Sequence, residues 1–332
     1  MRAQIYITHK PFPETVALLE PHGRVIWNKT DDSWSHDRIA AACSAADAIM
    51  VFMPDSLTAE DIAGFGNLKI VAGALKGYDN FDIAALAERG IWFSNVPDLL
   101  TVPTAELGVG LLIGLARHIP ASDAFIREGR FAGWTPRFYG RGLAGATAGI
   151  IGMGAVGRAL AERLKPFGMN IVYFDRKPCV DAEVGTFLPK ERVVAESDFL
   201  FPLTHLYRET HHLIGAEEIA GMKKGALLVN IGRGGLVDEE AVADALVTGH
   251  LAGYAADVFE MEDWIVPGRP LSISRRLLAM SDKTVFTPHT GSAVTEVRMA
   301  IEREAALNII DVLRGKPPRN AVLDVPWVLA QA

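Results

Sequence analysis

The sequence predicts an α/β protein built from doubly wound parallel sheets in two domains. Short apolar runs alternate with helical patterns through the first hundred residues, and the alternation resumes after residue 175. Between these regions, residues 147–175 show the pattern of a strand, a glycine turn, a helix and a second strand. At 332 residues, the chain is long enough for two domains of ordinary size, each with its own core.

The first hundred residues predict a sheet with helices on both faces. Five apolar runs indicate strands at 4–7, 24–27, 48–52, 69–73 and 91–94. Helical patterns lie between them at 14–19, 36–45, 59–65 and 83–89. Residues 98–103 break the alternation, and Thr104 is expected to cap an apolar helix that runs to about residue 118.

The stretch 147–175 predicts a dinucleotide site, because each part of it has a role in holding a pyrophosphate. Gly152, Gly154 and Gly157 form a G-x-G-x-x-G turn. They permit a tight turn, close approach of backbone to phosphate, and packing of helix on strand. The N-terminus of the following helix supplies free N–H groups to the phosphates. Asp175 ends the second strand, where its carboxylate can accept hydrogen bonds from ribose hydroxyls.

After Asp175 the chain returns to alternating strands and helices. Strands are expected near 199–201, 226–230, 254–256 and 285–287, and helices near 216–222, 238–249 and 292–313. The last helix is long enough to carry the chain back onto the first domain. We therefore expect a nucleotide domain, 100–293, inserted into a smaller domain formed by 1–99 and 294–332, with a substrate cleft between them.

Composition excludes several classes of protein. Lys and Arg number 33 against 40 Asp and Glu, and they are scattered, which argues against binding to nucleic acid or to an anionic membrane. Cys43 and Cys179 are the two cysteines, so we expect no disulfide framework. The N-terminus lacks the apolar core of a signal peptide, which favours a soluble cytoplasmic protein. No His, Cys, Asp or Glu residues have metal-ligand spacing, so no metal is expected, and we interpret His9, His205, His211 and His212 as structural or surface residues.

Candidate catalytic residues follow predicted strands, where open parallel sheets bind ligands. Arg233 lies among glycines in VNIGRGGLVD, and its guanidinium suits an oxyanion. Glu262 lies in ADVFEMED, and His289 lies in FTPHTGSA. If the two are close, His289 is a base whose tautomer the carboxylate sets. In the smaller domain, Lys76 precedes Gly77 and could hold an anion, and Met53 ends the third strand.

These motifs, in this order, resemble the NAD-dependent D-2-hydroxyacid dehydrogenases over nearly the whole chain. The resemblance places that family's catalytic arginine, glutamate and histidine at Arg233, Glu262 and His289. His205, in PLTHLYRET, replaces a proline of the family. The resemblance implies two Rossmann-like domains, a homodimer and NAD as cofactor. It also implies cofactor contacts from a set of residues in and around the motifs: Thr104, Ala155, Val156, Arg176, Ile231, Gly232, Asp257, Gly291 and Ser292, besides the glycines, Asp175, Arg233 and His289.

Several segments are similar, within that family, to phosphite (phosphonate) dehydrogenases, which oxidise phosphite to phosphate with NAD. They are FMPD, PDLLTVPTAEL, VFEMEDW and the loop from Trp134 to Tyr139, which includes Arg137. This similarity implies that Lys76, Gly77 and Arg233 hold phosphite, that Arg298 lies near the substrate, and that His289 takes a proton from an attacking water. We therefore expect phosphite as the substrate.

Two other functions stay open. One is an ordinary D-2-hydroxyacid dehydrogenase that acts on glyoxylate, hydroxypyruvate or a larger 2-oxo acid. The other is an NAD-sensing binding protein, which would need docking tails or an exposed peptide groove. For the cofactor, Asp175 favours NAD by repelling a 2′-phosphate, while Arg176 and Lys177 could attract one. We expect a preference for NAD with measurable use of NADP.

Overall fold

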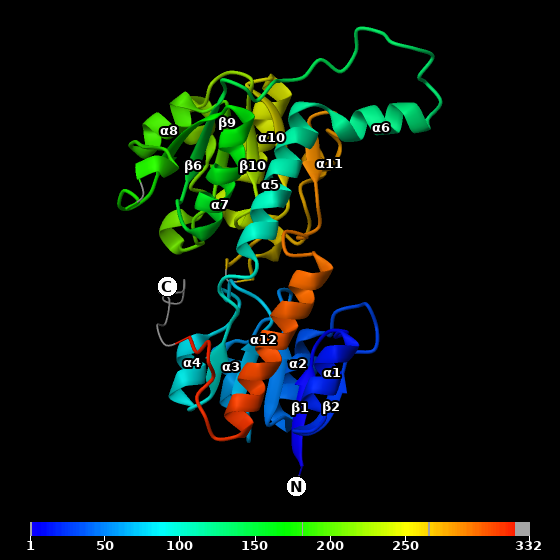
Figure 1. The fold of residues 1–332 in the computed structure, drawn as a ribbon, viewed down its shortest axis with the longest axis vertical. Coiled ribbons are helices and arrows are strands. Elements are labelled where there is room, and N and C mark those ends of the chain that lie inside the picture. Colours follow the sequence, from blue (N-terminus) through cyan, green and yellow to red (C-terminus); the bar gives the residue numbers. More distant parts are fainter. Residues whose placement is uncertain (1, 181, 265, 323–332) are drawn as a thin grey trace. The chain divides into compact units, whose positions relative to one another are not determined.

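The computed structural model describes residues 2–180, 182–264 and 266–322 (Figure 1). The chain divides into two compact units. Unit 1 combines the N-terminal region up to Leu100 with the segment from Ser292 onward, and unit 2 is Thr101–Gly291. Both units are built on parallel sheets, which confirms the predicted fold class.

Unit 1 contains a five-stranded parallel sheet of order β2-β1-β3-β4-β5. Its strands are short and mostly buried, as expected for a sheet covered on both faces. The strands are β1 (Ala3–Ile7), β2 (Gly23–Trp27), β3 (Ala48–Val51), β4 (Ile70–Gly73) and β5 (Trp92–Ser94). The helices are α1 (Pro13–Leu19), α2 (His36–Ala45), α3 (Ala59–Ala63), α4 (Ile83–Glu88) and α12 (Thr295–Leu313).

Alternate residues of each strand in unit 1 serve two separate cores, because side chains alternate across a sheet. In β3, Ile49 and Val51 pack with α2, α3 and α4, whereas Ala48 and Met50 pack with α1 and α12. The returning helix α12 is fixed to the start of α1 by Glu302. This buried carboxylate accepts hydrogen bonds from Phe12 N at 2.9 Å and Thr15 Oγ1 at 2.8 Å.

Unit 2 contains a seven-stranded parallel sheet of order β12-β11-β10-β9-β6-β7-β8. Its strands are β6 (Thr147–Ile151), β7 (Asn170–Phe174), β8 (Thr186–Phe187), β9 (Phe199–Pro202), β10 (Ala226–Asn230), β11 (Leu251–Ala256) and β12 (Thr284–Phe286). Its α-helices are α5 (Thr101–Ala116), α6 (Ile119–Arg127), α7 (Ala155–Leu164), α8 (Lys190–Glu196), α9 (Ala216–Gly221), α10 (Glu239–Thr248) and α11 (Arg275–Leu278). Short 3₁₀ turns are η1 (Lys165–Phe167), η2 (Ala182–Val184), η3 (Arg208–Thr210), η4 (Gly234–Leu236) and η5 (Glu260–Glu262).

The two faces of the sheet in unit 2 carry different sets of helices. Helices α5 and α7 pack on one face through a core that includes Ile150, Leu160 and Phe201. Helices α8, α9, α10 and α11 pack on the other through a core that includes Leu200, Leu228 and Tyr254. The strand order reverses at β6, between β9 and β7, where open α/β sheets bind ligands.

The prediction that Thr104 caps a helix is wrong, because α5 begins three residues earlier, at Thr101. Pro103 is accepted inside this first turn, where the missing N–H of proline has no helical partner to lose. The elements β8, α6, α8 and α11, which are two to nine residues long, were not predicted. The last helix begins at Thr295 rather than at residue 292.

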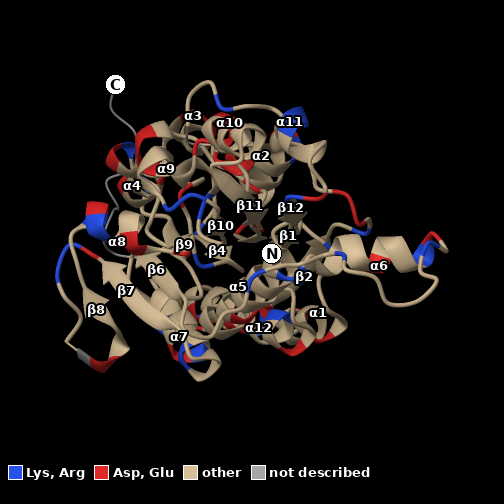
Figure 2. Cartoon of the chain, turned by 90° about the horizontal axis from the view of Figure 1, so that it is seen from above, with Lys and Arg blue, Asp and Glu red and all other residues tan. Residues whose placement is uncertain are grey.

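The described residues show neither a segregated charge nor a single membrane-spanning helix. Figure 2 shows Lys and Arg interspersed with Asp and Glu along the elements, without a long stripe of one sign among the described residues. Within the described ranges, no single helix combines the length and apolar character needed to cross a membrane. Helices α5 and α6 meet that test together, but they are bent by 62°.

Candidate active site

Three neighbouring strands of unit 2 bring the predicted catalytic residues to one edge of the sheet. Strands β10, β11 and β12 are parallel and adjacent, so the loops that follow them leave from the same edge. Backbone hydrogen bonds join these loops. Asp257 N donates to Asn230 O at 2.9 Å, and His289 N donates to Asp257 O at 2.8 Å.

His289 and Glu262 form a direct pair. His289 Nδ1 lies 2.6 Å from Glu262 Oε2, and the two side chains are 28% and 31% exposed, so a substrate can reach them. The other carboxylate oxygen of Glu262 accepts from Phe259 N at 2.8 Å, which fixes the carboxylate in the η5 turn. A carboxylate at Nδ1 places the proton of that nitrogen toward itself, which directs Nε2 outward for proton exchange.

The loop that carries His289 is held by the buried carboxylate of Asp257, which is 2% exposed. Asp257 accepts hydrogen bonds from Thr287 Oγ1 at 2.5 Å, Thr290 N at 2.7 Å and Gly291 N at 2.8 Å. His289 has a positive φ of 54°, a conformation that costs free energy for a residue with a Cβ. The three bonds to Asp257 hold the loop, and with it the imidazole, in place.

Arg233 lies in a second loop, and the side chain of Asn230 holds the backbone of this loop. Asn230 is fully buried at the end of β10; its Nδ2 donates to Arg233 O at 2.8 Å and its Oδ1 accepts from Gly232 N at 3.1 Å. Arg233 is partly exposed, and its Nη1 donates to Gly232 O at 3.0 Å. An arginine held in this way presents a fixed fork of N–H donors to an anion.

The Arg233 loop and the Glu262 turn are packed backbone to backbone. A Cβ placed on Gly234 would lie 1.9 Å from the carbonyl carbon of Phe259, so only glycine fits there. Gly235 N donates to Asp263 Oδ2 at 2.6 Å, which ties the same two segments together. The relative positions of Arg233 and Glu262 therefore depend on a glycine and a buried carboxylate next to them.

The glycine turn after β6 has the form expected for a dinucleotide site. Gly152 has a φ of 102°, and a Cβ there would lie 2.6 Å from Leu203 O. A Cβ on Gly157 would lie 2.4 Å from Gly152 O, so the helix α7 packs directly on the turn. Gly154 has open space around its Cβ position, and Ala155 and Val156 begin the first turn of α7. These residues fit a pyrophosphate at the helix N-terminus.

Asp175 closes this turn from the end of β7. Its Oδ2 accepts from Met153 N at 2.8 Å, and its Oδ1 accepts from Arg176 N at 2.6 Å. The carboxylate is partly exposed and each oxygen keeps a further lone pair, so it fits a ribose hydroxyl while it also shapes the glycine turn. Arg176 is exposed beside it.

Other residues predicted to contact the cofactor gather at the same sheet edge. A Cβ on Gly291 would lie 3.2 Å from Thr104 Oγ1, which places α5 against the His289 loop. Ile231 is buried after β10, and a Cβ on Gly232 would lie 2.7 Å from Pro202 O at the end of β9. Ser292 is the first residue of the segment that returns to unit 1.

The predicted substrate-binding residues of unit 1 lie at the carboxyl edge of its own sheet. Met53 follows β3, and Lys76 and Gly77 follow the neighbouring strand β4. Arg298 Nη1 donates to Ala74 O at 3.3 Å beyond the end of β4, and its guanidinium lies 5.7 Å from the Phe52 ring centroid. Burial lowers the pKa of Arg298, and the nearby Glu302 carboxylate opposes that shift. Two cationic side chains thus occupy this edge.

The aromatic loop that follows α6 is mostly exposed. Trp134 is 82% exposed and Tyr139 is 76% exposed. The Arg137 guanidinium lies 4.9 Å from the ring centroid of Phe125, which belongs to α6. This contact places Arg137 against α6.

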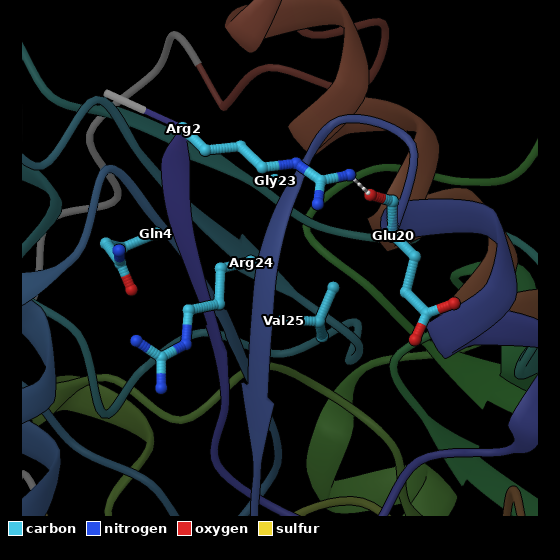
Figure 3. A pocket seen from close by; sticks show the side chains of 6 residues that line it. All are labelled: Arg2, Gln4, Glu20, Gly23, Arg24 and Val25. Carbon is cyan, nitrogen blue, oxygen red and sulfur yellow. Dashed lines mark hydrogen bonds between the residues drawn. The ribbon is translucent and has the colours of Figure 1, made fainter.

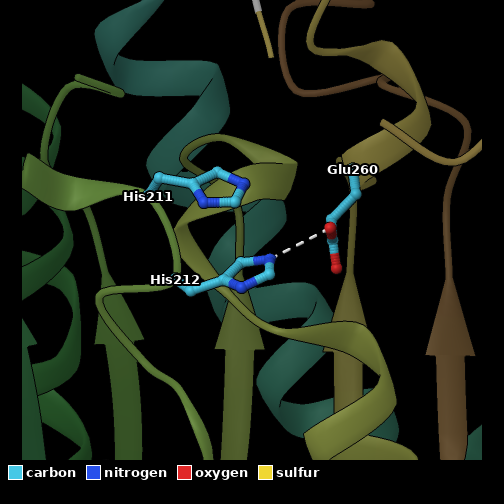
Figure 4. Close-up of side chains that lie close together, drawn as sticks. All are labelled: His211, His212 and Glu260. Carbon is cyan, nitrogen blue, oxygen red and sulfur yellow. Dashed lines mark hydrogen bonds and ion pairs between the residues drawn. The ribbon is translucent and has the colours of Figure 1, made fainter. Parts of the chain in front are cut away.

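Two further features of the surface were not predicted from the sequence. His211, His212 and Glu260 lie close together in unit 2 (Figure 4), although Glu260 is 48 residues from His212 and no local spacing indicates the cluster. A hollow of about 570 Å³ lies in unit 1 at the amino ends of β1 and β2 (Figure 3). Its lining is Arg2, Gln4, Glu20, Gly23, Arg24 and Val25, at the opposite ends of these strands from the predicted substrate residues.

Comparison with known proteins identifies the family of this arrangement. Residues 109–291 match the model of the D-isomer specific 2-hydroxyacid dehydrogenase, NAD binding domain. Glyoxylate reductases from Thermococcus litoralis and Pyrococcus horikoshii are 35% and 36% identical, over 97% of this chain and 97% and 96% of theirs. The structure of an NADPH-dependent glyoxylate/hydroxypyruvate reductase from Sinorhizobium meliloti, in complex with NADP and malonate, aligns over the whole of both chains with 27% identity and a TM-score of 0.84.

The prediction of phosphite as the substrate is wrong. Full-length relatives at 34–36% identity are named glyoxylate reductase. Some of the solved neighbours are named glyoxylate reductase or glyoxylate/hydroxypyruvate reductase. The comparisons favour the alternative, a D-2-hydroxyacid dehydrogenase of the glyoxylate or hydroxypyruvate reductase type. A lysine and an arginine suit any small anion, so these side chains did not distinguish phosphite from a carboxylate.

Replacing Gly234 by Ala is expected to lower turnover strongly, because the new Cβ displaces the Arg233 loop from the Glu262 turn. We expect kcat/KM to fall by about 100-fold or more, since a displacement of about 1 Å can cost that much. Steady-state kinetics measure the effect. Gly110→Ala in α5 is the matched control, because its Cβ meets no atom within 4 Å. Unchanged kinetics in Gly234→Ala would contradict the importance of this packing.

Proposed function

Because the chain belongs to the D-isomer specific 2-hydroxyacid dehydrogenase family, we propose that it reduces a small 2-oxo acid, glyoxylate or hydroxypyruvate, to the D-2-hydroxy acid. The observation that carries the proposal is the 2.6 Å pair of His289 and Glu262, joined through the packed loops to Arg233. This set combines an anion-binding group with an oriented proton donor, which is what reduction of a 2-oxo carboxylate needs.

The chain carries the NAD-binding domain of its family, so a nicotinamide dinucleotide is its cofactor. When bound, this cofactor supplies the hydride. The groups that would hold it are the α7 N-terminus with Gly152, Gly154 and Gly157, and the Asp175 carboxylate at the end of β7. The close backbone packing at Gly152 and Gly157 supports this assignment.

Arg233 would bind the carboxylate of the substrate. Its guanidinium provides paired N–H donors, and the buried Asn230 fixes its backbone on both sides. A positioned arginine holds the 2-oxo carbon in one orientation, and orientation of this kind supplies much of the rate acceleration in enzymes.

His289 would exchange the proton of the reaction. Its Nε2 would donate to the oxygen of the 2-oxo group during reduction and would accept the proton from the hydroxyl in the reverse direction. Glu262, at Nδ1, is a positioning residue that sets the tautomer and the plane of the ring. An NAD-sensing binding protein has no need of this pair, so the pair favours the enzyme.

Lys76, Gly77 and Arg298 are the groups of unit 1 that we propose for contact with an anionic substrate. The supporting observation is that both cations lie at the carboxyl edge of that sheet, after neighbouring strands or close to them. Met53 would contribute packing at the end of β3.

The surface of α6 and the loop after it supports a homodimer. The structure leaves no residue of α6 buried, although the helix carries Ile119 and Ile126, which are 50% and 58% exposed. Phe131, Trp134 and Tyr139 extend this apolar surface along the loop. Exposed apolar patches of this kind mark protein interfaces, and we propose a second copy of the chain as the partner.

The His289→Ala variant tests the proposed function. In the wild type, NADH absorbance should fall after addition of glyoxylate or hydroxypyruvate. The variant should lose about 100-fold to 10,000-fold in kcat, the usual worth of a general acid, while NADH binding by fluorescence stays within about twofold. Glu262→Gln should lose less and change the pH profile. In the same assay, Lys76→Met should raise KM more than it lowers kcat. Turnover by His289→Ala at the wild-type rate would refute the role of His289.

The Asp175→Ser variant tests the choice of cofactor. We propose that the wild type prefers NADH and uses NADPH measurably, because the Asp175 carboxylate repels a 2′-phosphate while Arg176 attracts it. The ratio of kcat/KM for NADPH to that for NADH should rise by about tenfold in Asp175→Ser, since about 1.4 kcal/mol of repulsion is removed. Arg176→Gln is the matched control and should lower the ratio. An unchanged ratio in Asp175→Ser would mean that Asp175 does not discriminate.

Sedimentation of the purified protein tests the homodimer. The wild type should sediment as a dimer at micromolar concentration, and the double variant Ile126→Asp, Trp134→Ser should shift toward the monomer because it places charge and polarity in the exposed apolar surface. Leu271→Ser, at another exposed apolar residue that is 86% exposed, is the control. A wild type that sediments as a monomer would exclude this interface.

A further inference from the structure

Two imidazoles and a carboxylate lie together in unit 2, in a cluster for which the proposed reaction has no use. His211 and His212 follow η3, and Glu260 begins η5. Each residue offers one ligand atom, and these atoms lie within 4.8 Å of one another (Figure 4). Among the described residues, this is the one group of three or more His, Cys, Asp or Glu side chains that meets this distance test.

We propose that His211, His212 and Glu260 bind a first-row divalent transition metal of the zinc type. Two imidazole nitrogens and one carboxylate oxygen are a ligand set that Zn²⁺, Co²⁺ and Ni²⁺ accept, with water in the remaining position. Mg²⁺ and Ca²⁺ prefer oxygen ligands, so the two histidines select against them. The His212 side chain is 35% exposed, which gives an ion access from solvent.

Glu260 is held in place before any metal arrives. Its Oε1 accepts from Glu239 N at 2.9 Å, and its own backbone N donates to Glu239 Oε1 at 2.9 Å. Its Oε2 then lies 3.1 Å from His212 Nε2. Ligand atoms of a tetrahedral zinc site lie about 3.3 Å apart, given bonds of about 2.0 Å. This edge of the site therefore already has the required length, and the ligand atom of His211 lies within 4.8 Å of the other two.

The backbone brings the two histidine rings to one side. In extended chain, successive side chains point to opposite sides. His212 instead has a positive φ of 51°, and the rings of His211 and His212 stack with centroids 3.9 Å apart and planes 22° apart. His212 N donates to Gly235 O at 2.7 Å, which fixes this conformation against η4. A strained backbone that aligns two imidazoles is the kind of feature found at functional sites.

A second carboxylate lies near the other ring nitrogen of His212. Asp238 Oδ2 lies 3.9 Å from His212 Nδ1, on the side that does not face Glu260. This distance is longer than a hydrogen bond, so Asp238 adds negative charge beside the site, which favours a bound cation, without fixing the ring. Glu260 and Glu262 belong to the same η5 turn, so a bound metal would also restrain the segment that carries Glu262.

The experiment is a titration of the full-length protein, after treatment with a chelator, with Zn²⁺ by calorimetry and with Co²⁺ by visible absorption. We expect about one equivalent per chain and the intense visible bands of tetrahedral Co²⁺. A Zn²⁺ concentration about 100 times the Kd should raise the unfolding temperature of the wild type by about 5 °C. His211→Phe keeps a stacked ring without ligand nitrogens, and it should weaken Zn²⁺ binding at least about tenfold and remove the Co²⁺ bands.

Three further variants separate this site from others. His36→Ala is the matched control, because His36 pairs with Asp61 at 3.0 Å in unit 1 and should leave binding unchanged. His289→Ala should also leave it unchanged, although His289 forms a similar pair with Glu262. His211→Ala repeats the His211 test if the phenylalanine disturbs folding, which circular dichroism reports. The proposal is overturned if the wild type binds no Zn²⁺ below about 1 mM, or if both His211 variants bind Zn²⁺ as tightly as the wild type, whether or not His289→Ala loses it.

Discussion

The candidate active site depends on one buried carboxylate, that of Asp257, directly after β11. The Asp257 carboxylate accepts hydrogen bonds from the hydroxyl of Thr287 and from the backbone N–H groups of Thr290 and Gly291. Its own backbone forms hydrogen bonds with the loops after β10 and β12. A buried carboxylate is stable only when its oxygens are satisfied, so the loop is held in the conformation that supplies these donors. His289 lies within that loop, so the hydrogen bonds to Asp257 also hold its ring next to the Glu262 carboxylate.

Close backbone packing at two glycines also fixes the positions of the loops. At Gly234 the Arg233 loop contacts the backbone of Phe259, and at Gly152 the nucleotide turn contacts that of Leu203. Neither contact has space for a Cβ, and the φ of Gly152 also favours glycine. The same physical requirement thus shapes two loops on different strands, the one proposed to hold a substrate anion and the one proposed to hold the dinucleotide.

The carboxylates around η5 have different tasks. Glu262 faces His289, whereas Glu260 faces His212. The carboxylates of Glu260 and Glu239 each accept a hydrogen bond from the backbone N–H of the other residue. Burial raises the pKa of Glu239 to about 7, against the hydrogen bond from Glu260 N, which lowers it. Two neighbouring acidic residues in one turn therefore orient two different histidines, one in the proposed catalytic pair and one in the proposed metal site.

The sequence by itself determined the fold class, most of the strands and the glycine turn, because these depend on local periodicity and on residues a few positions apart. It also placed Arg233, Glu262 and His289 after strands, and the parallel pairing of these strands brings the following loops to one edge of the sheet. It did not determine the start of α5, the helices α6, α8 and α11, or the cluster of His211, His212 and Glu260. Nor did it identify the substrate, because the cationic side chains suit any small anion. Only the tertiary structure brought together residues 27 and 48 positions apart, since loop packing and buried hydrogen bonds between strands decide such contacts.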